Sequence, residues 1–264
     1  MRAAAAIPEP IHELAEIPDR YTRLTPGHVD RVETDRFVVV RGPWWASVEG
    51  VRAAPDEVDD LVREVREATA GRTARWRIGP SAAPPDLEGR LRALGLHTPA
   101  NGVEELAALA TVTAPDAPRT DVRRVETFAD YRTAVELRWD AFGKSQEERA
   151  AEQASLAETF EALQQSGAVV DFVAYADGRP AATAASVVTG RGLLLVGGAT
   201  AAWARGRGLY RGLVRARWDE AVRLGTPALV VQADPSTSAP ILGRLGFVEV
   251  CRLRQLEDSF LSFE

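Results

Sequence analysis

Apolar side chains recur with strand and helix spacing along residues 119–264 and predict a regular alternation of the two kinds of element. Asp177-Gly178, between two apolar stretches, is typical of a β-hairpin turn. Ser145, with Glu148 three positions later, forms a capping-box pattern that opens a helix, and Gly167 ends it. The other predicted elements are strands at 122–125, 169–176, 180–188, 193–200, 229–231 and 247–256, and helices at 129–141, 209–223 and 238–245. The predicted order is therefore βααβββαβαβ.

The first part of the chain repeats the later part of this order. Its second helix ends in Leu94-Gly95-Leu96, and the matching helix ends in Leu245-Gly246-Phe247. In both copies 37 positions separate the helix start from the glycine, counted from Val58 and from Leu209. We interpret this match as an internal duplication, with coincidence between two α/β segments as the alternative. The earlier copy consists of a helix at 57–70, a strand at 75–78 and a helix at 87–94.

Composition and charge narrow the class of protein. The 264 residues are 45% apolar and carry a net charge of −6, which argues against general nucleic-acid binding. No segment has the apolar length of a membrane span, and residues 1–10 lack the apolar core of a signal peptide, so we expect a cytoplasmic protein. The single cysteine and three scattered histidines have no metal-ligand spacing, so no metal site is expected.

One region reverses the overall charge. Residues 203–223 hold six arginines against Asp219 and Glu220. A basic segment in an acidic protein favours a discrete anion site, and the alternative is an arginine-rich helix face in solvent.

A glycine-rich turn lies within this basic segment. Arg205-Gly206-Arg207-Gly208-Leu209-Tyr210 follows the predicted strand 193–200 and opens the predicted helix 209–223. Glycines let the backbone approach a ligand, and the free N–H groups of a first helical turn favour phosphate. The earlier copy has Asp56 and no glycine pair before its helix, so we do not expect it to bind the same anion.

These motifs resemble the Gcn5-related N-acetyltransferase (GNAT) superfamily, whose cofactor motif is Arg/Gln-x-x-Gly-x-Gly/Ala. The first four positions fit at Arg205–Gly208, and Tyr210 stands where Gly or Ala is usual. The resemblance implies an α/β (α+β) fold with two GNAT-like domains, each a mixed, mostly antiparallel sheet flanked by helices. Because residues 114–118 contain two prolines and are typical of a linker, we expect a degenerate domain at 1–115 and an acetyl-CoA-binding domain at 119–264.

The resemblance also implies the cofactor, acetyl-CoA or another acyl-CoA. Gly197-Gly198 in an apolar strand predicts a bulge that frees N–H groups near the thioester carbonyl, with a plain bend as the alternative. The residues expected to bind the cofactor are Gly198, Ala199, Thr200, Arg205, Gly206, Arg207, Gly208, Leu209 and Tyr210.

The catalytic groups are less defined. Many family members carry a tyrosine as general acid where this chain has Leu242, and the strand 193–200 has no acidic residue. The remaining candidates are Glu136 and Asp140, which share a helix face, Asp234 after the strand 229–231, and Tyr210. The alternatives are a solvated face for the first two, a turn for Asp234 and packing for Tyr210.

The predicted function is an acyl-CoA-dependent N-acyltransferase that moves acetyl from acetyl-CoA to an amine of a small molecule by direct attack in a ternary complex. The alternative is a non-catalytic acyl-CoA-binding or regulatory protein, which the missing tyrosine favours. We expect a small-molecule amine acceptor, no nucleic-acid or membrane partner, and a monomer or homodimer.

Overall fold

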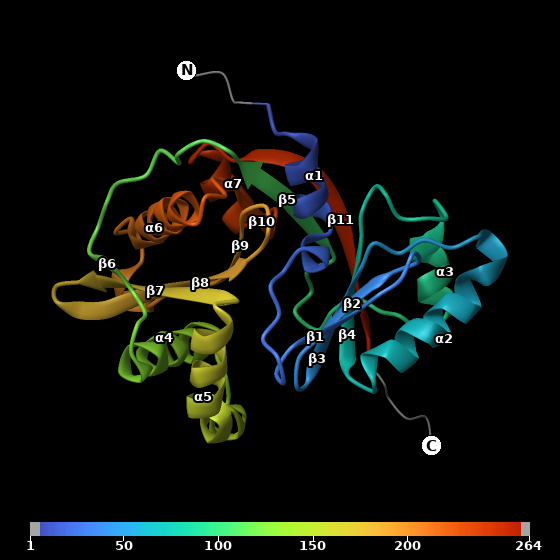
Figure 1. The fold of residues 1–264 in the computed structure, drawn as a ribbon, viewed down its shortest axis with the longest axis horizontal. Coiled ribbons are helices and arrows are strands. Elements are labelled where there is room, and N and C mark those ends of the chain that lie inside the picture. Colours follow the sequence, from blue (N-terminus) through green and yellow to red (C-terminus); the bar gives the residue numbers. More distant parts are fainter. Residues whose placement is uncertain (1–5, 260–264) are drawn as a thin grey trace.

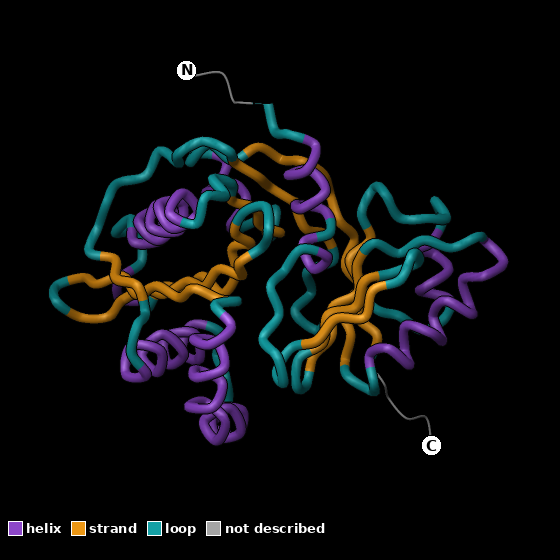
Figure 2. Tube along the Cα trace, in the orientation of Figure 1, coloured by secondary structure: helices purple, strands orange, loops and turns teal. Residues whose placement is uncertain are grey.

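The computed structural model describes residues 6–259, which form one eleven-stranded sheet flanked by helices (Figure 1). The strand order is β1-β2-β3-β4-β11-β5-β10-β9-β8-β7-β6. Figure 2 shows the strands as one band that runs through both halves of the molecule. The strands are β1 Asp30–Glu33, β2 Val38–Arg41, β3 Trp45–Glu49, β4 Thr73–Ile78, β5 Glu105–Thr111, β6 Val122–Arg124, β7 Val169–Ala176, β8 Arg179–Val188, β9 Leu193–Thr200, β10 Leu229–Ala233 and β11 Val248–Asp258.

Helices cover the sheet differently in the two halves. In the half that carries β6–β10, α6 and α7 lie on one face and α4 and α5 on the other, whereas α2 and α3 cover the outer face of the half with β1–β4 (Figure 1). The helices are α1 Glu9–Glu16, α2 Val58–Thr69, α3 Leu87–Ala93, α4 Phe128–Ala141, α5 Gln146–Ser166, α6 Leu209–Arg223 and α7 Ser238–Gly243, with short 3₁₀ turns η1 Pro18–Arg20, η2 Pro55–Glu57 and η3 Ala202–Ala204.

The predicted order βααβββαβαβ is confirmed in the second half, and β7, β9 and α6 have the predicted bounds. Ser145 and Glu148 form the expected capping box at the start of α5, and Gly167 ends that helix with a positive φ of 58°. Asp177 and Gly178 also take positive φ in the turn between β7 and β8. Local sequence signals therefore determine these elements.

The last strands of the two halves exchange places. β5, from the first half, lies between β10 and β11, while β11, from the second half, lies between β4 and β5. Four strands therefore lie beyond β11 on one side of this central pair, and five lie beyond β5 on the other. Each half completes its sheet with the other half's final strand, so hydrogen bonds of the sheet couple the two.

The helix ends support the duplication. Gly95 and Gly246 have positive φ of 96° and 94°. The apolar residue after each glycine donates its N–H to a carbonyl five positions back, Leu96 to Leu91 at 3.1 Å and Phe247 to Leu242 at 3.2 Å. Two segments with the same spacing therefore make the same turn.

Several elements were not expected from the sequence. They are α1 and the strands β1, β2, β3 and β5. Residues 114–118 contain no helix or strand, as predicted, but the sheet continues on both sides of them. The division into domains at 1–115 and 119–264 stays a prediction.

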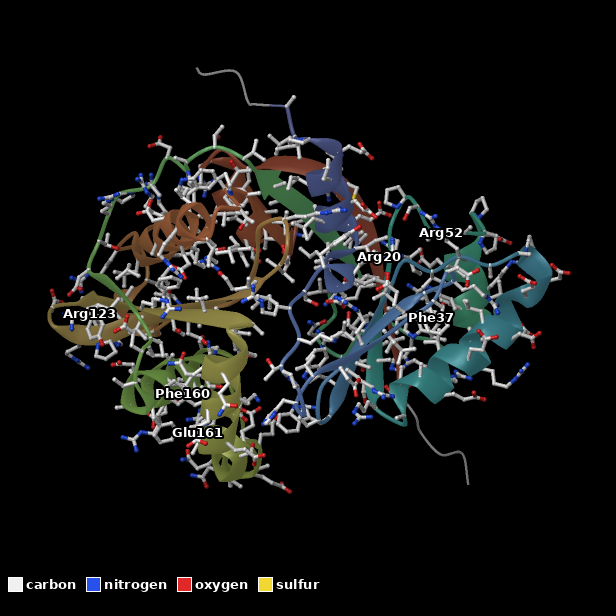
Figure 3. All side chains as sticks on the ribbon, in the orientation of Figure 1. Arg20, Phe37, Arg52, Arg123, Phe160 and Glu161 are labelled. Atoms are coloured by element: carbon white, nitrogen blue, oxygen red, sulfur yellow. The ribbon has the colours of Figure 1, made fainter. Side chains whose placement is uncertain are left out.

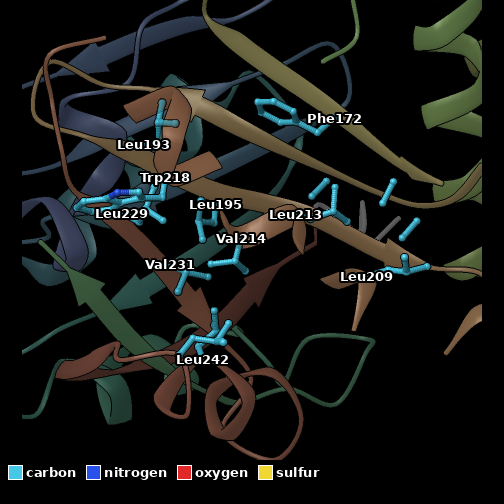
Figure 4. Close-up of a cluster of buried hydrophobic side chains, with 14 of the residues drawn as sticks. Phe172, Leu193, Leu195, Leu209, Leu213, Val214, Trp218, Leu229, Val231 and Leu242 are labelled. Atoms are coloured by element: carbon cyan, nitrogen blue, oxygen red, sulfur yellow. The ribbon is translucent and has the colours of Figure 1, made fainter. Parts of the chain in front are cut away.

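Separate apolar clusters fill the layers. One packs α6 against β7–β10, and Figure 4 shows Leu213, Val214 and Trp218 of the helix facing Leu193, Leu195 and Val231 of the strands. A second lies under α2 and α3, where Figure 3 labels Phe37, and a third joins α4 to α5, where it labels Phe160. Among the described residues, no helix combines the length and the apolarity of a membrane crossing. Of the N-terminal segment 1–10, residues 1–5 lie outside the described part.

Candidate functional site

The turn between β9 and α6 leaves the first amide groups of a helix without a capping side chain. Gly206 and Gly208 have positive φ of 77° and 78°, which residues with side chains adopt rarely. Gly208 is the N-cap of α6 and no side chain caps it, whereas Thr127 and Ser145 cap α4 and α5. A Cβ built on either glycine would meet nothing within 4 Å. The free N–H groups therefore face space that an anion can fill.

The arginines of the basic segment have different partners. Arg207 forms a two-pronged ion pair with Asp177 in the β7–β8 turn, at 2.7 and 2.9 Å, and its guanidinium lowers the pKa of that carboxyl. Arg211 donates to the Asp116 carbonyl at 3.0 Å. Arg205 is exposed and makes no ion pair within residues 6–259. An incoming anion therefore finds Arg205 free and competes with Asp177 for Arg207.

The remaining arginines of α6 bond within the helix or to the neighbouring strand β8. Arg215 pairs with Asp219 and Arg223 with Glu220. Arg217 is 1% exposed and donates to the Leu213 and Ala185 carbonyls, and its burial lowers the pKa of the guanidinium. The basic segment is therefore only partly available to a ligand.

Strands β9 and β10 separate after two paired residues, which opens the sheet beside the glycine-rich turn. Their parallel pairing is confined to Leu193–Leu229 and Leu194–Val230. Beyond it, the register of β9 against β8 shifts between Val196 and Ala199, which confirms the predicted bulge, and Gly197 there has a φ of 58°. Ala199 and Thr200 then resume pairing with β8.

Tyr210 lies against this bulge. A Cβ on Gly198 would come within 3.0 Å of the Tyr210 ring, so the glycine makes room for the tyrosine. On its other side the ring centroid is 6.0 Å from the guanidinium carbon of Arg217. The structure thus supports the packing alternative for Tyr210 and places its ring at the opening between β9 and β10.

The position of the missing tyrosine is part of the core. Leu242, on α7, is completely buried in the cluster beneath α6 (Figure 4). A side chain there faces apolar neighbours, and no acid replaces it at that point.

The three predicted carboxylates occupy the surface or a turn. Glu136 lies 3.7 Å from Arg132 and Asp140 lies 2.8 Å from Arg149, with both carboxylates more than half exposed. Asp234 accepts hydrogen bonds from the N–H and hydroxyl of Ser236, which lower the pKa of Asp234. Their catalytic role stays a prediction, although these contacts fit the surface and turn alternatives.

A buried ion pair ties α4 to the bulge. Arg138 bonds Asp171 of β7 at 2.5 Å, and its side chain would lie 3.4 Å from a Cβ on Gly197. Burial and the Asp171 charge raise the pKa of Tyr131 to about 12. Arg138 and Tyr131 line a cavity that Trp44 of the β2–β3 turn also lines, from the other half. The sequence offered one signal, an acidic residue inside the apolar strand 169–176.

A second cluster of polar side chains, centred on Glu49, lies at the junction of the halves. The sequence analysis did not predict it. Glu49, at the end of β3, is completely buried and accepts hydrogen bonds from the Asp19 N–H at 3.0 Å, Arg77 at 2.9 Å and Gln232 at 3.3 Å. Arg77 also donates to Ser47 at 2.7 Å. Burial, with the nearby Asp19 carboxylate, raises the pKa of Glu49 to about 8. Gln232 comes from β10, directly beyond its pairing with β9.

The raised pKa makes stability depend on pH. In the unfolded chain the Glu49 carboxyl has its ordinary pKa near 4.5. The folded state therefore holds the proton more tightly, and this stabilisation is complete below that pH and is lost as pH rises through about 8. In Glu49→Gln this loss should disappear, so urea midpoints should fall less between pH 5 and pH 8 than in the wild type. Glu64→Gln, at an exposed ion pair with Arg36, is the control, and its urea midpoint should change with pH as the wild type's does. The same change of midpoint with pH in all three proteins would contradict the raised pKa of Glu49.

The structure thus consists of two α/β halves that share one sheet, with a glycine-rich turn at the opening of one half. No protein-family model matches the chain, and a search of curated proteins found no match. Solved structures do match. A GCN5-related N-acetyltransferase from Kribbella flavida is 18% identical with a TM-score of 0.66, and the match covers 94% of this chain and 95% of the other.

Two further structures extend the comparison. A tandem GNAT protein from the clavulanic acid biosynthesis pathway is 16% identical with a TM-score of 0.58, covering 97% of this chain and 89% of that one. A GCN5-related N-acetyltransferase from Sphaerobacter thermophilus is 18% identical with a TM-score of 0.53, covering 85% and 80%. The chain has the tandem GNAT fold, which confirms the resemblance inferred from Arg205–Tyr210.

Proposed function

We propose that this protein is an acyl-CoA-dependent N-acyltransferase whose cofactor binds the second half, with acetyl-CoA as the acyl donor. The observation that carries the proposal is the uncapped N-terminus of α6 behind Gly206 and Gly208, beside the opening between β9 and β10. The space at both glycines is open, so a phosphate group can approach the backbone there, and the exposed Arg205 would add positive charge. The similar proteins named as N-acetyltransferases support the same reaction class.

The first half lacks the features of a second cofactor site. The corresponding helix α2 follows Asp56 and Glu57 and has Asp59 and Asp60 in its first turn. These carboxylates would repel phosphate. We therefore infer one cofactor site per chain.

The reaction transfers an acyl group from sulfur to nitrogen. The lone pair of a neutral amine forms the N–C bond at the thioester carbonyl, the C–S bond breaks, and the thiolate leaves with its electron pair. The nitrogen loses one proton and the thiolate gains one, which gives an amide and free CoA thiol. Acyl-CoA, when bound, supplies the activated carbonyl.

The chain's own residues would position this step. We expect backbone N–H groups at the β9 bulge to polarise the carbonyl, and the Arg138–Asp171 pair would hold α4 beside the bulge. Because Leu242 is in the core, a proton for the thiolate would come from Tyr210 or from water.

The test is amine-dependent release of CoA thiol. Wild-type protein is incubated with acetyl-CoA and a panel of primary amines, and free thiol is followed with a thiol reagent while the amide is detected by mass spectrometry. We expect thiol and amide in equal amounts with at least one amine. Thiol without amide would indicate hydrolysis, and retained acetyl-CoA binding without thiol release across diverse amines would favour the non-catalytic alternative.

A further inference from the structure

A cavity of about 350 Å³ lies between the halves, directly beside the opening of the sheet. Leu195 and Val196 of β9 and Gln232 of β10 line it, and each lies beyond the last paired residues of the two strands. Its volume falls in the range of small-molecule sites. Apolar side chains from both halves form much of its wall, among them Val40 and Trp45 of the first half and Val187, Leu194 and Leu195 of the second.

The first half closes this cavity through a fixed contact. Thr22 pairs with Thr189 as an isolated antiparallel bridge, and the Arg23 N–H donates to the Val188 carbonyl at 2.8 Å. This contact holds η1, and with it Asp19, against the β8–β9 turn. Figure 3 labels Arg20, the neighbour of Asp19, in the space between α1 and the strands of the first half.

Asp19 carries an acceptor in this wall that lacks a partner, and the neighbouring Arg77 Nε is a donor there without one. Asp19 is 8% exposed, and its Oδ2 atom is buried without a hydrogen bond in the described structure. The nearest cation, Arg77, is 3.9 Å away and already serves Ser47 and Glu49. A buried carboxylate oxygen without a donor is costly, so a ligand that donates there gains affinity.

The open oxygen of Asp19 calls for a ligand that donates a hydrogen bond. Behind Asp19, Glu49 accepts the Asp19 N–H and holds its own proton below about pH 8, so the Arg77 guanidinium stands chiefly against the Asp19 carboxylate. Arg23 lies at the exposed rim and donates to the Gly167 carbonyl. An ammonium group at Asp19 would donate to the open Oδ2 atom, and the apolar wall would cover an apolar body.

We propose that this cavity is the acceptor site and that it takes a primary amine with an apolar body, its ammonium group bonded to Asp19 Oδ2. The assignment as acceptor site rests on the proposed acyl transfer, whereas binding of the amine does not. The first half, which lacks the phosphate turn, thus supplies the recognition of the amine. One proton of the bound ammonium then passes to the Asp19 carboxylate, which leaves a neutral amine as the nucleophile.

Binding is tested without acyl-CoA, by calorimetry with phenethylamine, 2-phenylethanol and phenylacetate. We expect the wild type to bind phenethylamine more tightly than the alcohol or the acid. Asp19→Asn should weaken phenethylamine binding about ten- to hundredfold, as for loss of a charge-assisted hydrogen bond. Asp56→Asn, an exposed carboxyl outside the cavity, should bind as the wild type does.

Val196→Trp provides a second, independent variant. Val196 is 36% exposed, so a larger side chain there can be accommodated without disturbing the core, and it should block the cavity and abolish phenethylamine binding. The proposal is overturned if phenethylamine does not bind, or if 2-phenylethanol or phenylacetate binds as tightly as phenethylamine. It is also overturned if neither Asp19→Asn nor Val196→Trp weakens phenethylamine binding. Phenethylamine binding at Asp19 without any acyl transfer would instead refute the proposed function and leave the amine site standing.

Discussion

Replacement of Gly208 with glutamate is expected to abolish the stabilisation of this protein by acetyl-CoA. At a ligand concentration about one hundred times the dissociation constant, wild-type protein should gain about 2.7 kcal/mol, which corresponds to a rise in melting temperature of about 5 °C or more. Glutamate at the N-cap of α6 would put a carboxylate at the proposed position of the phosphate charge. Differential scanning fluorimetry with and without acetyl-CoA measures the effect.

Gly225 provides a matched control for backbone strain. Gly225 and Gly208 have φ of 77° and 78°, and a Cβ at either would meet no atom within 4 Å. Gly225→Glu should therefore lower the ligand-free melting temperature as Gly208→Glu does, but should keep the acetyl-CoA shift. A full shift in Gly208→Glu would remove the glycine-rich turn from the cofactor site.

Replacement of Leu253 with alanine should destabilise both halves together by about 2–5 kcal/mol. Leu253 is completely buried on β11 and lies opposite Leu106 of β5, in the cluster that also contains residues of α1. Because β11 pairs with β4 on one side and β5 on the other, loss of the Leu253 side chain should weaken the sheet toward both halves. Hydrogen exchange measured on β2–β3 and on β8–β9 should show the same loss of protection.

Val222→Ala is the control for this prediction. Val222 is 51% exposed on α6, so its truncation should change the free energy of unfolding by less than about 0.5 kcal/mol. Faster exchange in only one half of Leu253→Ala would show that the halves unfold independently despite the exchanged strands.

The strand exchange could not be predicted from the pattern of the sequence. Glu105–Thr111 reads ELAALAT, and alanine and leucine favour helix over strand by intrinsic propensity. Pairing with β10 on one side and β11 on the other makes it a strand, and both partners lie more than one hundred positions later in the chain. By contrast, β7, β9 and α6 are bounded by local glycine and turn signals, which explains why their bounds were predicted.

The candidate site also has one part that the sequence predicted and one part that depends on the fold. Gly206 and Gly208 are adjacent in sequence to the helix they open, so the turn was predictable. The group around Asp19 comes from η1, β3, β4 and β10, and only the fold brings these segments together. The acidic residue that ends β3 was a weak signal, since Glu49 follows apolar positions that point to a buried strand.

A calorimetric titration of the wild-type protein with acetyl-CoA measures directly whether α6 holds the cofactor. We expect saturable binding with one acetyl-CoA per chain, because of the two corresponding helices, α2 and α6, only α6 begins behind glycines with an uncapped N-terminus. The same titration of Gly208→Glu should show no binding. A stoichiometry of two, or binding that Gly208→Glu leaves unchanged, would contradict the assignment of the cofactor to the second half.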